Sequence, residues 1–297
     1  MDIGQFLQQL LLDPLTPAFM QRVMVAVLMI GVICGVIGAY VVTRGMAFMG
    51  DALAHTILPG VAVAYMASNG NPGWILVGGM IAGVISAVVI SLLSRGANLS
   101  EDTAIGIVFA GALALGIGII SSQRDYSTDI SHLLIGNIFA VGNDDLLLML
   151  GISVAVLIGI TLLYKEFLVI SFDPTFGETL RLPGRALNTL LLVLLALTVV
   201  VALQAVGIAL VAALLVIPAA TARYFVKRLH HLMGLAALVG AVGGVIGVYL
   251  SWHLSIAPSA AIVLTLVAFF LLAFLFAPGN GYFQRGRKPA IARQIAP

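Results

Sequence analysis

Long apolar runs repeat along almost the whole chain, and they restrict the possible fold more than any other feature of the sequence. A helix needs about 20 apolar residues to cross the hydrocarbon core of a bilayer. Runs of roughly that length lie at 20–42, 46–67, 74–93, 103–121, 145–164, 187–205, 207–222, 233–252 and 257–276. The sequence therefore predicts an all-α integral membrane protein with about nine transmembrane helices, or eight if the short run at 207–222 does not cross fully.

The composition excludes a water-soluble domain. Hydrophobic residues make up 61% of the chain and charged residues only 9%, whereas soluble domains contain about 25% charged residues. A formal net charge of +2 is too small to indicate a nucleic-acid-binding protein. Because the spans of one chain pack into one bundle, we expect a single transmembrane domain over 1–297, with an outer amphipathic segment at 1–19 and a cytoplasmic tail at 278–297.

The distribution of Lys and Arg predicts the orientation, because cytoplasmic loops of membrane proteins carry an excess of these residues. Nine spans place the two termini on opposite sides. With the amino terminus outside, twelve of the 14 basic residues fall on the inner side, and only Arg22 and Arg124 fall on the outer side. We therefore expect a multi-pass protein of the cytoplasmic membrane with an outer amino terminus and a cytoplasmic carboxyl terminus.

Two connections between the predicted spans are longer than a turn requires. In the inner one, 165–186, Pro174 and Pro183 bracket a stretch that could form one short helix, which suits docking onto a cytoplasmic partner. The outer one, 122–144, carries several ionisable side chains that could gather cations, contact an extracellular protein or simply be solvated. Counting Asp145 at the start of the next span, these side chains are Asp125, Asp129, His132, Asp144 and Asp145.

Glycines four residues apart recur in the predicted spans, and this spacing allows the backbones of neighbouring helices to approach closely. The sequence therefore predicts tight helix contacts at several places. The pairs are Gly31 and Gly35, Gly79 and Gly83, Gly240 and Gly244, and Gly243 and Gly247.

Asp51 and His55 are the two ionisable residues that lie well inside the predicted spans. A charged Asp at the centre of a span costs roughly 2.5 to 3.5 kcal/mol, so such residues usually face a partner, a cavity or a transport pathway. Residues four apart share one helix face, with Cβ atoms about 5–6 Å apart. His55 is predicted about 13 Å from the inner end of its span, near the bilayer midplane where transporters commonly bind substrate.

Pro59 adds a potential third ligand, because proline has no N–H to donate to the carbonyl oxygen four residues earlier, which belongs to His55. A carboxylate, an imidazole and a carbonyl oxygen suit manganese, iron or zinc, whereas copper(I) or an iron–sulfur cluster prefers several sulfur ligands. The alternative is an Asp–His pair that only stabilises the bundle.

Sequence signatures of catalysis are missing. None of Lys165, Lys227 and Lys288 follows a glycine, so the chain has no phosphate-binding glycine–lysine loop and would need a separate ATPase. The predicted spans also lack HExxH and GxSxG patterns, which argues against an intramembrane hydrolase. These observations leave a gradient-driven secondary transporter as an alternative to an ATP-driven one.

Four blocks of sequence resemble the manganese, zinc and iron permease family of ATP-binding-cassette (ABC) importers. The blocks are RGMAFMGDALAHTILPGVAVAY at 44–65, SEDTAIGIVFAGALALGIGII at 100–120, DPTFGETLRLPGR at 173–185 and AVGIALVAALLVIPAATAR at 205–223. They occur in the order typical of the family, and the resemblance extends over roughly 23–276. The implied fold is similar to that of the cobalamin and siderophore importer permeases, with fewer helices.

The resemblance also implies partners and roles for individual residues. It implies a homodimer of permeases, two cytoplasmic ATPase subunits that bind ATP, and an extracytoplasmic metal-binding protein. The chain would be a transport subunit and not an enzyme, and its cargo would be a divalent ion, with manganese favoured over zinc or iron. Asp51 and His55 match the family residues associated with metal passage. The expected coupling residues are Asp173, Pro174, Glu178, Leu182, Pro183 and Gly184.

Overall fold

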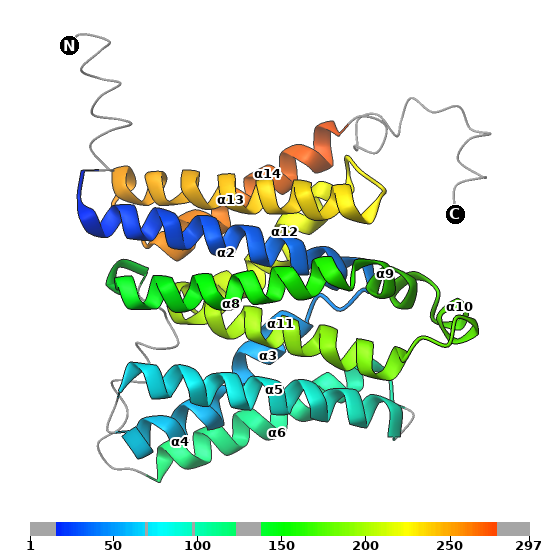
Figure 1. Ribbon diagram of the computed structural model, residues 1–297. Helices are drawn as coiled ribbons and strands as arrows, with labels where there is room; N and C mark the ends of the chain where they lie inside the picture. The colour runs from blue at the N-terminus through cyan, green and yellow to red at the C-terminus, as the bar shows by residue number, and fades with distance from the viewer. Residues whose placement is uncertain (1–15, 69–70, 97–98, 123–137, 278–297) are drawn as a thin grey trace.

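The computed structural model describes residues 16–68, 71–96, 99–122 and 138–277, and the regular secondary structure among these residues consists of helices joined by turns and short irregular segments. Most of the helices lie side by side along one common direction (Figure 1). In the described part of the chain, seven helices are long and apolar enough to cross a membrane. They are α2 (Ala18–Thr43), α5 (Pro72–Gly96), α6 (Glu101–Ser121), α8 (Asn143–Leu162), α11 (Gly184–Val206), α13 (Leu229–Leu254) and α14 (Pro258–Phe276).

The two other predicted spans take different forms. The span at 46–67 is divided into α3 (Met49–Thr56) and α4 (Leu58–Ser68), with Ile57 in a turn between them. Pro59 accounts for this break, because it cannot donate the hydrogen bond that would continue the helix. The span at 207–222 forms α12 (Ile208–Arg223), which is separated from α11 only by Gly207.

Gly207 allows α11 and α12 to reverse direction within a single residue. Its φ of 79° lies in a region that glycine adopts without the steric cost of a side chain. α12 contains 16 residues, so at 1.5 Å per residue it is about 24 Å long, somewhat shorter than a hydrocarbon core of about 30 Å. α2 begins and α14 ends at opposite ends of the bundle (Figure 1), which is consistent with the predicted nine passes.

Glycines bring α2 and α13 into close contact, as their spacing predicted. A Cβ atom added to Gly31 would lie 2.7 Å from the backbone nitrogen of Ala241, and Gly240 faces Gly31 from the other side. Gly243 and Gly247 similarly face α14. Gly79 and Gly83 approach side chains and not the backbone of a neighbouring helix. Dispersion between closely packed backbones is a main source of helix association in lipid, so these positions help to hold α2, α13 and α14 together.

The inner connection expected at 165–186 contains two helices rather than one. α9 (Tyr164–Phe172) follows α8 after a break at Leu163, and α10 (Pro174–Thr179) comes next. α9 forms because the side chains of Phe167 and Ile170 are buried against the bundle, which places apolar residues on one helix face. Both helices lie at the same end of the bundle, and α10 projects beyond the long helices (Figure 1).

The remaining described helix, η2 (Ile138–Ala140), is a single 3-10 turn before α8. Most of the predicted outer segment 1–19 and of the outer connection 122–144 lies outside the described residues, as does the tail 278–297.

Candidate functional site

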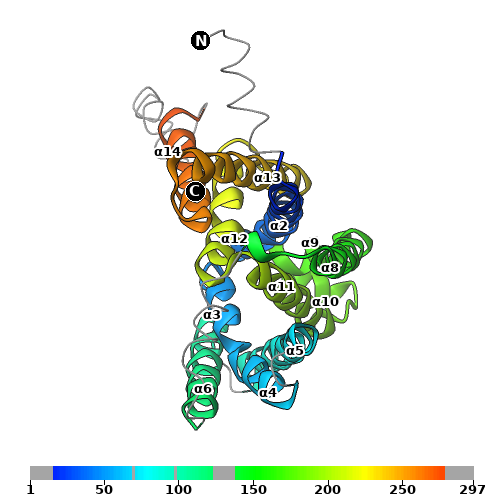
Figure 2. The same ribbon diagram turned by 90° about the vertical axis from the view of Figure 1, so that its left-hand side faces the viewer.

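α3 holds both residues of the predicted metal site. It lies about midway between the two ends of the bundle (Figure 1), and the end-on view in Figure 2 shows it at the edge of the bundle between α6 and α12. It packs against α5, α6, α11 and α12. Because Met49, Leu53 and Thr56 fill the buried face, the face that carries Asp51 and His55 is turned away from the core of the chain.

Asp51 and His55 point toward each other with a gap between them. His55 Nε2 lies 3.9 Å from Asp51 Oδ1. The side chain of His55 is 28% exposed, and that of Asp51 is 37% exposed. This separation is too long for a hydrogen bond. Two ligand atoms that are each about 2.0–2.2 Å from one ion lie at most about 4.4 Å apart. The observed separation therefore allows one cation to bind both side chains.

Phe109 of α6 contributes to this site, although sequence patterns gave no sign of it. Its ring meets the His55 imidazole edge to face, and its other neighbour is the ring of Phe48, 5.9 Å away between centroids. His55 Nδ1 is buried and has no hydrogen-bond partner among the described residues. Since Nδ1 is enclosed and Nε2 faces Asp51, Nε2 is the nitrogen available to a cation.

The carbonyl oxygen of His55 is less free than the sequence predicted. The helix break does remove its α-helical donor, but the N–H of Ile57 is directed to this oxygen instead. The helix then resumes at once, because the Val61 N–H donates to the Ile57 carbonyl at 3.0 Å. The side chains of Asp51 and His55 are therefore stronger candidates for ligands than this carbonyl group.

No third ionisable ligand joins this pair from within the described part of the chain, where no group of three or more His, Cys, Asp or Glu could hold a metal. Asp125, Asp129 and His132 lie outside the described residues. Asp145 has a structural role, because its Oδ2 accepts a hydrogen bond at 2.9 Å from the Gly142 N–H at the start of α8.

The predicted coupling residues form a compact element around α10. Asp173 caps this helix, since its Oδ1 accepts a hydrogen bond at 2.9 Å from the Phe176 N–H, and Pro174 occupies the first turn. The Leu182 N–H donates to the Gly177 carbonyl at 3.0 Å, which folds the chain back over α10. Pro183 then leads into α11 at Gly184.

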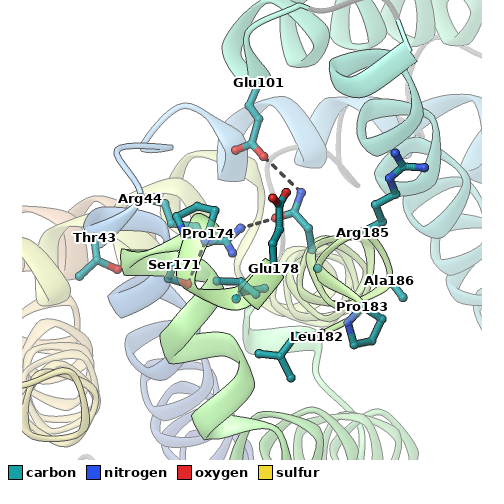
Figure 3. Close-up of a pocket in the computed structure, with 14 residues that line it drawn as sticks. Thr43, Arg44, Glu101, Ser171, Pro174, Glu178, Leu182, Pro183, Arg185 and Ala186 are labelled. Carbon is teal, nitrogen blue, oxygen red and sulfur yellow. Dashed lines mark hydrogen bonds between the residues drawn. The ribbon is translucent and has the colours of Figure 1, made fainter. Parts of the chain in front are cut away.

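A cavity of about 860 Å³ separates this element from the bundle. Figure 3 shows the side chains that line it, among them Pro174, Glu178 and Leu182 of this element and Arg44 and Glu101 of the bundle. Pro183 and Gly184 also line the cavity, whereas Asp173 does not. Arg44, Glu101, Ser171 and Asn188 were not singled out from the sequence as a group, because they come from four separate helices or helix ends.

Similarity to known proteins extends over nearly the whole chain. The sequence profile described as the ABC 3 transport family matches residues 16–277. The manganese transport system membrane protein MntC of Halalkalibacterium halodurans is 41% identical over 282 residues, which cover 95% of each chain. The chelated iron transport system membrane protein YfeD of Yersinia pestis is 35% identical, over 90% of this chain and 88% of that one.

A solved structure has a similar fold. A chain in the structure of PsaBC from Streptococcus pneumoniae in complex with Fab matches this chain with a TM-score of 0.80 and 33% identity. The match covers 96% of this chain and 99% of that one. Helix order and packing are therefore alike over almost the full length of both proteins.

Proposed function

Because the chain belongs to the ABC 3 transport family, we propose that manganese is the ion it moves, and that Asp51 and His55 bind this ion during passage. The chain is the multi-pass membrane permease of an ABC importer for a divalent transition metal, and it is not itself an enzyme. Manganese is favoured by the 41% identity to a manganese transport protein, and iron and zinc are the alternatives.

The proposal for the metal site is carried by the open gap between Asp51 and His55 near the middle of the bundle. The Asp51 carboxylate would offset part of the cost of removing the ion from water, and His55 Nε2 would replace one water ligand. Oxygen and nitrogen ligands of this kind suit manganese, iron and zinc.

A homodimer would complete this site. The Asp51–His55 face is partly exposed on the single chain, and an ionisable pair facing hydrocarbon would be costly. A second copy placed over α3 would shield the pair from lipid. It would also bring a second Asp–His pair to the same depth, so that the two chains offer four side-chain ligands, the number common in zinc sites.

The coupling segment, which we define as residues 173–184, would bind the ATPase subunit. It projects at one end of the bundle (Figure 1) and exposes large apolar side chains at Phe176 and Leu180, which are each 51% exposed. Exposed apolar side chains grouped at a projecting element mark protein interaction sites. Movement of this segment on ATP binding and hydrolysis would switch the metal site between the two sides of the membrane.

The end of the bundle that carries α10 would be cytoplasmic. Arg44 follows the end of α2, Arg185 lies in the first turn of α11, and Arg223 ends α12. These helix ends lie on the same side as α10 (Figure 1), and basic residues favour the cytoplasmic side. An extracytoplasmic metal-binding protein would then deliver the ion at the opposite end, where α2 begins.

The decisive experiment is uptake of labelled manganese into proteoliposomes that contain the permease with its ATPase and binding protein. We expect uptake that requires ATP and both partners. Uptake by the permease alone, driven by a proton or sodium gradient, would instead support a secondary transporter. Competition by unlabelled iron and zinc identifies the cargo. If unlabelled iron or zinc inhibits the uptake of labelled manganese at a much lower concentration than unlabelled manganese does, manganese is the wrong assignment.

A further inference from the structure

Asn188, in the first turns of α11, lies at the centre of a chain of side-chain hydrogen bonds that joins Arg44 to Glu101. Its Oδ1 accepts a hydrogen bond from Arg44 Nη1, and its Nδ2 donates to Glu101 Oε1 at 3.2 Å. Arg44 also donates from Nε to the Ser171 hydroxyl at 3.0 Å. The Asn188 side chain is buried, so these hydrogen bonds are partly shielded from water. Both outer partners carry a charge, which strengthens such hydrogen bonds.

Arg44 is hydrogen-bonded to residues that flank the coupling segment on both sides. Ser171 lies two residues before Asp173, and Asn188 lies four residues after Gly184. A guanidinium group has several donors in a rigid planar arrangement, so one Arg side chain can hold two partners in fixed positions. A displacement of α10 therefore acts on Arg44 from both sides.

The same hydrogen bonds reach the two elements that surround His55. Arg44 is the last residue before the turn at Gly45, whose φ is 74°, and this turn leads into α3. Glu101 is the first residue of α6. Phe109 lies eight residues farther along that helix, about 12 Å at 1.5 Å per residue, and it contacts the His55 ring. One end of the chain of hydrogen bonds thus leads to α3, and the other leads to the aromatic neighbour of His55.

We propose that the Arg44–Asn188–Glu101 hydrogen bonds transmit movement of the coupling segment to α3 and α6, which makes Asn188 a positioning residue for transport. This inference rests on the proposed function, because it assumes that the coupling segment responds to an ATPase. If the segment moves, it either carries α3 and α6 with it or breaks hydrogen bonds to charged groups. Intact hydrogen bonds therefore favour a joint movement of both helices around His55.

The test is the number of manganese ions transported per ATP hydrolysed in the reconstituted complex. In Asn188→Asp the new carboxylate still accepts from Arg44, but it repels the Glu101 carboxylate. We expect the ratio to fall roughly tenfold, the size expected from losing a hydrogen bond to a charged group. Adding Glu101→Gln restores a donor opposite the new carboxylate, so the double variant should recover most of the wild-type ratio. A purely structural role for Asn188 would instead lower the yield of assembled complex and leave the ratio of the assembled fraction unchanged.

Thr189→Val is the matched control, because Thr189 also makes a hydrogen bond between helices, to Ser91 at 2.6 Å, but stands outside this chain of hydrogen bonds. Its ratio should equal that of the wild type. Arg44→Lys provides a milder second variant, since lysine keeps the charge but cannot hold both partners in the same geometry. It should lower the ratio even if Asn188→Asp does not assemble.

Wild-type ratios in assembled Arg44→Lys or Asn188→Asp would overturn the inference, as would a double variant no better than Asn188→Asp. These outcomes leave the proposed function intact as long as the wild-type complex shows ATP-dependent uptake. If the wild-type complex itself lacks such uptake, the proposed function fails first.

Discussion

The Phe109 ring of α6 lies edge to face against the His55 imidazole of α3, with ring centroids 5.5 Å apart and an angle of 78° between the planes. The contact joins two different helices, so the orientation of the imidazole depends on how α6 packs on α3. It leaves His55 Nε2 on the side of Asp51. The position of a potential metal ligand is therefore set by an aromatic residue that binds no metal itself.

Replacing Phe109 should weaken metal binding without abolishing transport. Phe109→Ala removes an aromatic contact worth about 0.5–1.5 kcal/mol, which corresponds to roughly a 2- to 10-fold change. We expect the manganese concentration for half-maximal uptake to rise by that factor. Leu115→Ala is the control, because Leu115 lies on the same helix and is largely exposed. Unchanged half-saturation in the Phe109 variant would contradict a role for this contact.

Removing either proposed ligand should abolish manganese uptake. Asp51→Ala and His55→Ala each leave a single side-chain ligand in the gap, and because both side chains are partly exposed, truncation should cost little stability. Uptake and association with the ATPase should be measured on the same preparations. The carboxylate of Asp102, exposed at the start of α6, supplies the control Asp102→Ala. A properly inserted Asp51 or His55 variant with wild-type uptake would refute the site.

A charge on the exposed face of α10 should weaken association with the ATPase. Phe176→Asp places a carboxylate where the proposed interface is apolar, and the loss should be at least tenfold in affinity, as for an interface residue worth more than about 1.4 kcal/mol. Because Phe176 is half exposed, the thermal stability of the permease in detergent should not change. Ile256→Asp, at an exposed position after α13, is the control. Equal affinities for the two variants would exclude this face of α10.

The close contact between α2 and α12 should be intolerant of a side chain at Gly38. A Cβ atom there would overlap the Leu215 carbonyl oxygen, which belongs to the backbone of α12 and cannot rotate away. Gly38→Ala should therefore lower stability by about 1–3 kcal/mol through overpacking, seen as a lower melting temperature in detergent. Gly234→Ala serves as control, because no atom lies within 4 Å of the added Cβ. Similar melting temperatures would contradict the packing described here.

The sequence by itself determined the features that depend on local pattern. Continuous apolar runs are sufficient to predict membrane helices, because lipid offers no hydrogen bonds to the backbone and the whole span must therefore be helical and apolar. The membrane class and the approximate number of spans follow from this constraint, and the break near Pro59 follows from the missing N–H of proline. The spacing of Asp51 and His55 also needs no tertiary structure, since residues four apart on a helix always share one face.

Only the tertiary structure decided which distant residues complete each site. Phe109 is one apolar residue in an apolar span, so nothing in the sequence distinguishes it from its neighbours. The Asn188 side chain bonds residues 87 and 144 positions away in the chain, and no periodic pattern encodes such pairs. The partial exposure of the Asp51–His55 face likewise depends on how α6 and α12 pack beside α3. Local periodicity fixes which face of a helix a residue occupies, whereas the packing of other helices decides what that face meets.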